Sequence, residues 1–365
     1  NSISNRSSIY RYIKKYNLSG VILYDEDLKK TGLGTRNIES PSQLKKLISS
    51  LQSISKTPLF ISIDQEGGHV NRLKTNYGFP EFPSWKHIGL LDNDLITEEF
   101  AISISNTLNE VGINLNFAPV LDLDYGDETY IGKLERANSG DPKKVIKHSR
   151  KFIKILRDNK IVSCGKHFPG QGSGKGDTHN GFIDISKTWS VADMLPFAEM
   201  IESNHLDMIM ISHVHNNMFD SKYPSSLSKE IITNCLRNDL NFKGVIICDD
   251  PSMKAISNHY ELEEMFALMI NAGIDLFCLG NNLDYDITTE LGGAFLAISY
   301  IFFLFPVRKC QLDEFSVNSS LYRLKVEGLS IQGVTVKEIK FTLVLSKNSF
   351  SIKRILVVIF GHMFV

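Results

Sequence analysis

The sequence predicts an α/β protein of the (β/α)8 TIM-barrel type with an irregular last unit. Short apolar segments alternate along the chain with amphipathic helical segments, and polar residues follow the ends of the apolar segments. Parallel strands need helical crossovers, so this alternation indicates a parallel sheet. The carboxyl ends of the strands surround the active site in a barrel. An open, doubly wound sheet also binds ligands there, but seven or eight regular units favour a barrel.

The expected strands are short apolar runs separated by longer segments of helical periodicity. The first helix opens on Ser40 and Pro41, which are typical of a helix start. The expected helices are 40–51, 97–111, 142–159, 228–240 and 261–272. The expected strands are 21–24, 58–64, 113–123, 162–167, 207–213, 245–249 and 274–279.

The last part of the chain departs from this pattern. Residues 294–305 are expected to supply the eighth unit as a strand or a buried helix, because periodicity does not separate the two. We expect 312–325 to form a closing helix. The predicted domains are therefore a barrel over 1–325 and a C-terminal extension over 326–365, with strand-like segments at 341–345 and 355–360.

Composition excludes several classes of function. The net charge of −1 gives no electrostatic reason to expect a nucleic-acid partner or an anionic membrane surface. The longest apolar run, 294–307, is shorter than the roughly 18–20 residues that span a bilayer. The five cysteines have no C-x-x-C spacing, so we expect neither a disulfide framework nor a zinc site.

A glycine-rich segment at 162–181 is the first candidate for chemistry. A short strand ends at Lys166 and His167, and a loop with alternating glycines then carries Asp177 and His179. Glycine gives the loop conformational freedom, and functional residues concentrate on loops held by rigid elements. The glycine spacing matches neither a Walker loop nor a dinucleotide-binding fingerprint.

Five motifs in order carry a resemblance to a known family. They are IDQEGGHVNRL at 63–73, KHFPGQG at 166–172, DTH at 177–179, PSSLS at 224–228 and FKGVIICDDPSM at 242–253. Together they resemble glycoside hydrolase family 3, in its single-barrel β-N-acetylhexosaminidase branch, over about residues 20–325. The resemblance implies a retaining exo-β-N-acetylglucosaminidase that uses no metal or organic cofactor.

Asp249 is the candidate nucleophile. A retaining glycosidase needs a carboxylate that attacks the anomeric carbon. Asp250 is followed by Pro251 and is expected to cap a helix start, which leaves Asp249 to face the barrel mouth. The alternative is that both aspartates only cap and solvate that helix. The resemblance places the family nucleophile at Asp249.

Asp177 and His179 are the candidate acid/base pair. The group that protonates the leaving oxygen must later deprotonate water, and histidine suits both steps near neutral pH. A neighbouring carboxylate holds the imidazole tautomer and stabilises its charged form. The family branch uses such a pair on a flexible loop. The alternative is a solvated polar loop without a catalytic role.

The resemblance also implies a set of sugar-binding residues. Arg136 belongs to a loop, IGKLERANSGDP at 131–142, that is two residues longer before the arginine than the family pattern. His213 is expected either to contact substrate or to be satisfied by hydrogen bonds behind the site, and Glu66 is expected to stabilise the turn at Gly67 and Gly68. The predicted substrate-binding residues are Asp64, Arg72, Arg136, Lys166, His167, His213 and Met253.

The implied substrate is a carbohydrate with terminal β-N-acetylglucosamine, such as muropeptides or chito-oligosaccharides. We expect a monomer in a bacterial cytoplasm or periplasm. Two other functions stay open: a glycoside phosphorylase, which would use the same covalent intermediate with phosphate as acceptor, and a barrel that binds sugar without catalysis. The resemblance disfavours a β-glucosidase, because β-glucosidases of this family usually carry the acid/base on a second α/β domain. We expect no such domain after residue 325.

Overall fold

The computed structural model describes residues 7–26, 36–278, 309–314, 321–331 and 334–344. Seven parallel strands form one sheet in the order in which they occur along the chain. Each strand pairs with the next in parallel register. They are β1 (Gly20–Ile22), β2 (Phe60–Ile63), β3 (Leu115–Asn116), β4 (Val162–Phe168), β5 (Met208–Ile211), β6 (Val245–Cys248) and β7 (Leu276–Phe277).

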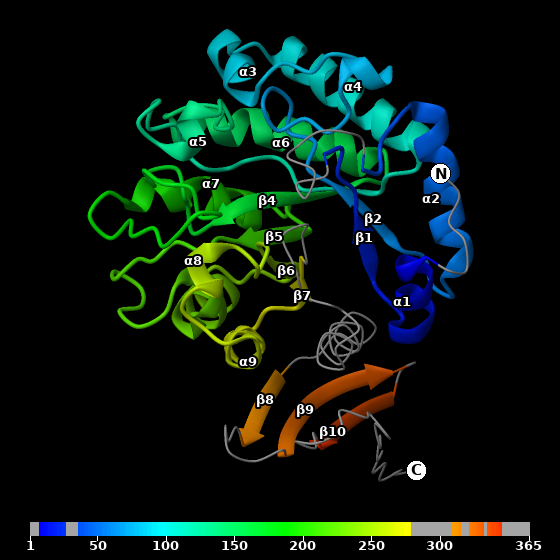
Figure 1. Cartoon of the computed structure of the whole chain (residues 1–365). Coiled ribbons are helices and arrows are strands. Elements are labelled where there is room, and N and C mark those ends of the chain that lie inside the picture. Colours follow the sequence, from blue (N-terminus) through cyan, green and yellow to red (C-terminus); the bar gives the residue numbers. More distant parts are fainter. Residues whose placement is uncertain (1–6, 27–35, 279–308, 315–320, 332–333, 345–365) are drawn as a thin grey trace.

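Helices connect the strands and lie along the outside of the sheet (Figure 1). The order of strands and helices is that of an irregular (β/α)8 barrel. The major helices are α1 (Ser8–Tyr16), α2 (Pro41–Ile54), α4 (Asp94–Val111), α6 (Pro142–Asp158), α7 (Val191–Glu202), the π-helix η4 (Glu230–Asp239) and α9 (Leu262–Ala272). The shorter ones are η2 (Thr75–Tyr77), α3 (Trp85–Leu91), α5 (Tyr130–Lys133), η3 (Ser225–Leu227) and α8 (Lys254–Ser257).

Local sequence explains where several of these helices begin. At α2 the Ser40 side chain accepts a hydrogen bond from the Gln43 N–H at 3.2 Å, and Pro41 takes the first helical position. At α6 the Asp141 side chain accepts from the Lys143 N–H, again with proline following the cap. Helix α7 was not predicted, although Ser190 and Asp193 form a capping box at its start.

The face of the sheet that is turned to the helices buries two clusters of apolar side chains, and the opposite face buries a third. One cluster joins strand residues to α7, η4 and α9, and another joins them to α2 and α4. A third cluster consists of residues from the strands and their ends alone: Leu115, Phe117, Cys164, Met208, Met210, Ile247 and Cys278. Successive strand side chains point to opposite faces, so the third cluster fills the face of the sheet turned away from the helices.

The expected closing helix at 312–325 is wrong. Strands β8 (Lys309–Glu314), β9 (Leu321–Ile331) and β10 (Val334–Val344) form a separate antiparallel sheet. Apolar residues alternate with polar ones in this part of the chain, as at Leu324 and Val326, and alternation favours a strand over a helix. The strand-like segment at 341–345 is part of β10.

Two other expected segments are not among the described residues, so the structure does not test them. The eighth unit at 294–305 and the segment at 355–360 lie outside the described residues. The predicted domain boundary at 325 stays a prediction, and β9 runs across it. Among the described residues, no helix has both the length and the apolar composition to cross a bilayer.

Candidate active site

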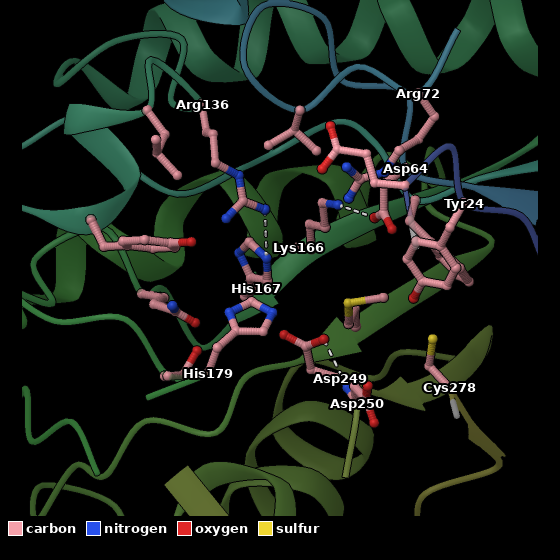
Figure 2. Close-up of a pocket in the computed structure, with 18 of the residues that line it drawn as sticks. Tyr24, Asp64, Arg72, Arg136, Lys166, His167, His179, Asp249, Asp250 and Cys278 are labelled. Carbon is pink, nitrogen blue, oxygen red and sulfur yellow. Dashed lines mark hydrogen bonds and ion pairs between the residues drawn. The ribbon is translucent and has the colours of Figure 1, made fainter. Parts of the chain in front are cut away.

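One cavity lies where the strands of the parallel sheet end. Its walls come from β4 and β5 and from the segments that follow β1, β2, β3, β4, β6 and β7 (Figure 2). Its polar and charged lining residues are Tyr24, Asp25, Glu26, Asp64, Arg72, Tyr130, Arg136, Lys166, His167, Gln171, Thr178, His179, Asp249 and Asp250. The fold therefore gathers residues as far apart in the chain as Tyr24 and Asp250 around one space, as expected for the carboxyl edge of a parallel sheet.

Asp249 follows β6 directly and faces this cavity. Its backbone N–H donates to the Ile211 carbonyl at 3.0 Å, which continues the pairing of β6 with β5. Burial raises the pKa of the Asp249 carboxyl, but the nearby His213, His167 and His179 and the Asp250 N–H together lower it below its ordinary value. The side chain is therefore a carboxylate at neutral pH.

Asp250 does not cap a helix, so that expectation is wrong. Its Oδ1 accepts a hydrogen bond from the Ser252 N–H at 2.9 Å, which makes a tight turn at Pro251. Helix α8 begins only at Lys254. Asp250 also lines the cavity beside Asp249, because the chain turns immediately after the strand.

Asp177 and His179 form a short pair on the loop after β4. Their side chains are joined by an Oδ1–Nδ1 contact of 2.6 Å, and the His179 N–H donates to the same oxygen at 2.9 Å. Two backbone hydrogen bonds attach the loop to the start of α8, from Lys254 N–H to the His179 carbonyl and from Ala255 N–H to the Thr178 carbonyl. These bonds place His179 in the same cavity as Asp249 (Figure 2).

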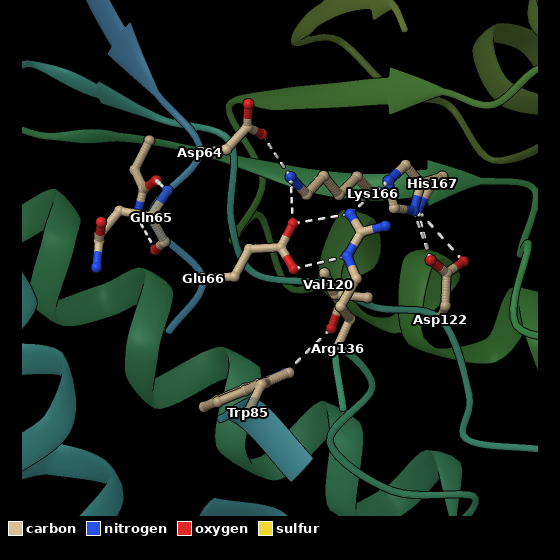
Figure 3. Close-up of polar contacts among 10 residues, drawn as sticks. Asp64, Gln65, Glu66, Trp85, Val120, Asp122, Arg136, Lys166 and His167 are labelled. Atoms are coloured by element: carbon tan, nitrogen blue, oxygen red, sulfur yellow. Dashed lines mark hydrogen bonds and ion pairs between the residues drawn. The ribbon is translucent and has the colours of Figure 1, made fainter. Parts of the chain in front are cut away.

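The β4 end supplies two further lining side chains, each held by a carboxylate. Lys166 Nζ lies 2.8 Å from Asp64 Oδ1 and 2.6 Å from Glu66 Oε1. His167 Nδ1 lies 2.6 Å from Asp122 Oδ2 (Figure 3). Because a carboxylate only accepts, Nδ1 carries the imidazole hydrogen. Asp122 also accepts from the backbone N–H groups of His167 and Gln171, so it fixes the strand end.

Arg136 reaches the cavity in spite of its lengthened loop. It donates to both oxygens of Glu66, from Nε at 2.9 Å and from Nη2 at 2.8 Å, and Nη2 lies 3.2 Å from His167 Nε2. Arg72 lies on the far side of the cavity. Its guanidinium stacks over the Tyr24 ring at 5.7 Å from the centroid and is 3.8 Å from Asp25.

Two of the predicted substrate-binding residues do not line the cavity, and neither does Asp177, which reaches it only through His179. His213 is fully buried, with Nε2 3.0 Å from the Asp250 carbonyl and Nδ1 2.8 Å from the Ser226 hydroxyl. This geometry agrees with the second of the two roles expected for His213, a histidine satisfied by hydrogen bonds behind the site. Burial lowers the pKa of His213. Met253 is 1% exposed and packs at the start of α8. Direct substrate contact by either residue is therefore not supported.

Sequence reasoning missed several members of the site. Glu66 was assigned to a turn, but its side chain binds Lys166 and Arg136 instead. Asp122 was given no role, and the only signal for it was its place near the end of the expected strand 113–123. Tyr24 and Cys278 line the cavity without any motif to mark them, whereas Gln171 belongs to the KHFPGQG motif but was given no role. Among the described residues, no group of three or more His, Cys, Asp and Glu side chains is placed to hold a metal ion.

The comparison with protein families decides the class of this site. The glycosyl hydrolase family 3 N terminal domain matches residues 2–291. The chain belongs to glycosyl hydrolase family 3. It is accordingly a glycoside hydrolase, and the family and the barrel fold predicted from the five motifs are confirmed.

Family 3 relatives resemble this chain over most of its length. The β-hexosaminidase of Nitrosomonas eutropha is 31% identical over 296 residues, covering 77% of this chain and 79% of the relative. The β-hexosaminidase of Photobacterium profundum is 35% identical over 249 residues, covering 68% and 73%.

Two solved structures of family 3 share the fold. NagZ from Neisseria gonorrhoeae, in complex with N-trifluoroacetyl-D-glucosamine, superposes with a TM-score of 0.68 at 26% identity, over 82% of this chain and 86% of that one. A β-N-acetylglucosaminidase from Paenibacillus sp. str. FPU-7 gives a TM-score of 0.70 at 29% identity. The match covers 82% of this chain but only 58% of the Paenibacillus chain.

Proposed function

We propose that this family 3 chain is a retaining exo-β-N-acetylglucosaminidase that works by double displacement. The relatives named β-hexosaminidase and the Neisseria structure with a glucosamine derivative support this substrate class. The observation that carries the mechanism is that Asp249 and His179, from separate segments, line one cavity. One is an ionised carboxylate, and the other is an imidazole with a carboxylate partner.

In the first step Asp249 attacks the anomeric carbon while His179 protonates the leaving oxygen. The bond from the anomeric carbon to the leaving oxygen breaks as the bond to Asp249 forms, giving a glycosyl ester. Because Nδ1 of His179 is bound to Asp177, Nε2 is the nitrogen that transfers the proton. Asp177 holds the ring and stabilises the charged form of His179.

In the second step a water molecule replaces the leaving group. His179 now accepts a proton from that water, which attacks the anomeric carbon and releases Asp249 as a carboxylate. Two displacements at the same carbon return the β-configuration. The reaction consumes one water and leaves both catalytic groups in their starting protonation states.

The sugar is held by the remaining charged lining residues. Asp64 accepts from sugar hydroxyls, whereas Lys166, Arg72 and Arg136 donate to sugar oxygens. His167 completes the set beside Arg136. Terminal β-N-acetylglucosamine of cell-wall fragments is the proposed substrate.

The decisive experiment compares aryl β-N-acetylglucosaminide with aryl β-glucoside and follows the anomer of the released sugar by NMR. Hydrolysis of the first substrate with initial release of the β-anomer is the expected result. Initial release of the α-anomer, or preference for the glucoside, would contradict the proposal. Adding inorganic phosphate tests the phosphorylase alternative, which requires a sugar phosphate as product. A 2-fluoro sugar that labels Asp249 would exclude a barrel without catalysis.

A further inference from the structure

Glu66 lies behind the cavity wall and holds two of the side chains that form it. It is 4% exposed and is not a lining residue, whereas Lys166 and Arg136 are. We infer that Glu66 is a positioning residue for glycoside hydrolysis: it orients Lys166 and Arg136 toward the sugar and neutralises their charge. This inference rests on the proposed function, which places the sugar in this cavity.

The carboxylate of Glu66 is fully used by these two cations. Oε1 receives Lys166 Nζ at 2.6 Å and Arg136 Nη2 at 2.8 Å, and Oε2 receives Arg136 Nε at 2.9 Å (Figure 3). The fork of two parallel bonds fixes the plane of the guanidinium, since such pairs are geometrically specific. Glu66 therefore sets the direction in which both side chains meet the cavity.

After these contacts, Lys166 and Arg136 still have N–H donors that are available to a sugar. An ammonium has three N–H donors. Lys166 uses one on Glu66 and one on Asp64, which leaves one. Arg136 has five donors, of which Glu66 takes two and His167 faces a third, so both Nη1 hydrogens remain. Without Glu66, Lys166 would keep only its contact with Asp64, and Arg136 only its contact with His167, so neither side chain would be held from two sides.

Charge gives Glu66 a second role. Glycoside hydrolysis passes through a transition state with positive charge on the sugar ring. Lys166 and Arg136 bring two positive charges to the wall, and Asp64 and Glu66 balance them. Burial would raise the pKa of Glu66, but Arg136 and Lys166 lower it well below its ordinary value, so the balancing charge is present at neutral pH. Its loss would leave an extra cation near the developing charge.

The turn after Glu66 does not depend on this side chain. Backbone hydrogen bonds close it, from the N–H groups of Glu66 and Gly67 to the Val70 carbonyl at 3.0 and 3.2 Å. Gly68 N–H donates to the Phe82 carbonyl at 3.0 Å. The expected role of Glu66 in stabilising the turn is therefore replaced by the role proposed here.

The test is Glu66→Gln, which keeps the size of the side chain and removes its charge. We expect kcat/KM for an aryl β-N-acetylglucosaminide to fall about 100-fold, because small misplacements of binding groups cost this much. The inhibition constant of free N-acetylglucosamine should rise in the same variant, because the sugar is held less well. Asp193→Asn is the matched control: Asp193 is a fully buried carboxylate that caps α7 outside the cavity lining. It should lower the melting temperature and leave both constants unchanged.

A second measurement separates positioning from a general loss of stability. If Glu66 acts partly through Lys166, then Glu66→Gln should lower kcat/KM by a smaller factor when Lys166 is already methionine, since residues that act as a unit are not additive. Part of the loss should remain, because Glu66 also holds Arg136. Glu66→Asp keeps the charge and should retain more activity than Glu66→Gln.

Each outcome decides one claim. A wild-type protein that hydrolyses no β-N-acetylglucosaminide overturns the proposed function. An active wild type with a folded Glu66→Gln variant of unchanged kcat/KM and inhibition constant overturns the positioning role. Equal losses from Glu66→Gln in the wild-type and Lys166→Met backgrounds overturn the claim that Glu66 positions Lys166.

Discussion

The Nδ1 atom of His179 lies 2.6 Å from Oδ1 of Asp177, although only Thr178 separates the two residues. The same oxygen accepts the backbone N–H of His179, so the carboxylate folds back on its own loop. Asn180 Nδ2 binds the other oxygen at 3.0 Å. The pair is thus held locally, while its position over Asp249 depends on the backbone bonds to α8.

His179→Ala should slow the hydrolysis of poor leaving groups far more than that of activated ones. A nitrophenolate leaves without protonation, whereas an alcohol or a sugar needs the acid, which contributes about 10²–10⁴-fold. The measurement is kcat/KM for a series of leaving groups of rising pKa. His215→Ala is a control, because His215 is bonded to Asn217 and lies outside the cavity lining. Equal losses across the series would rule out His179 as the acid.

Asp249→Asn should reduce turnover at least about 1,000-fold, because an amide cannot form the glycosyl ester. The fold should persist, since the hydrogen bond from the Asp249 N–H to the Ile211 carbonyl does not involve the side chain. Steady-state kinetics and far-UV circular dichroism check the two parts. Near-normal hydrolysis by the folded variant would remove Asp249 from the mechanism.

Acid should destabilise the protein partly through Glu66. Its pKa in the folded state is held below the ordinary value of 4.5, because Arg136 and Lys166 outweigh burial. As pH falls below about 4.5, the unfolded chain binds this proton first, so the stability that Glu66 contributes above that pH is lost progressively. Urea unfolding at a series of pH values should show a steeper loss in the wild type than in Glu66→Gln. Parallel profiles would contradict this origin.

Gly89→Ala should disturb the loop that carries Arg136. A Cβ at Gly89, in α3, would overlap the backbone carbonyl of Asn138, which is two residues beyond Arg136. The Asn138 side chain also donates to the Trp85 carbonyl at 3.2 Å, so the loop cannot move freely. We expect a higher KM and a lower melting temperature. Gly181→Ala places its Cβ in open space and should leave the melting temperature unchanged. Wild-type KM in Gly89→Ala would show that the loop adapts.

Much of the site could be predicted because it lies at strand ends. Asp64 and Asp249 follow β2 and β6, while Lys166 and His167 lie at the end of β4, and parallel strands bring their carboxyl ends to one edge. The partners of Glu66 could not be predicted in this way. Arg136 is 70 positions away in a loop of unusual length, and no local pattern tells which side chain a buried carboxylate meets.

In the C-terminal region it was the secondary structure that could not be predicted from the sequence. A helix was expected at 312–325, but pairing with β10 decides the conformation of β9, and that partner is specified by residues further along the chain. Secondary structure follows local periodicity only where tertiary pairing agrees with it.

The amino-acid order alone determined the alternation of strands and helices, because that alternation follows from local periodicity. The two catalytic candidates came from the resemblance of the five motifs to glycoside hydrolase family 3. Only the tertiary structure decided that Glu66 bridges Lys166 and Arg136, that Asp250 turns the chain, and that His213 is satisfied behind the cavity. The contacts of Glu66 and His213 join segments far apart in the chain, and burial forces each polar group to find a partner there. The Asp250 turn is instead a local contact with Ser252, which the Asp-Pro pair alone did not distinguish from a helix cap.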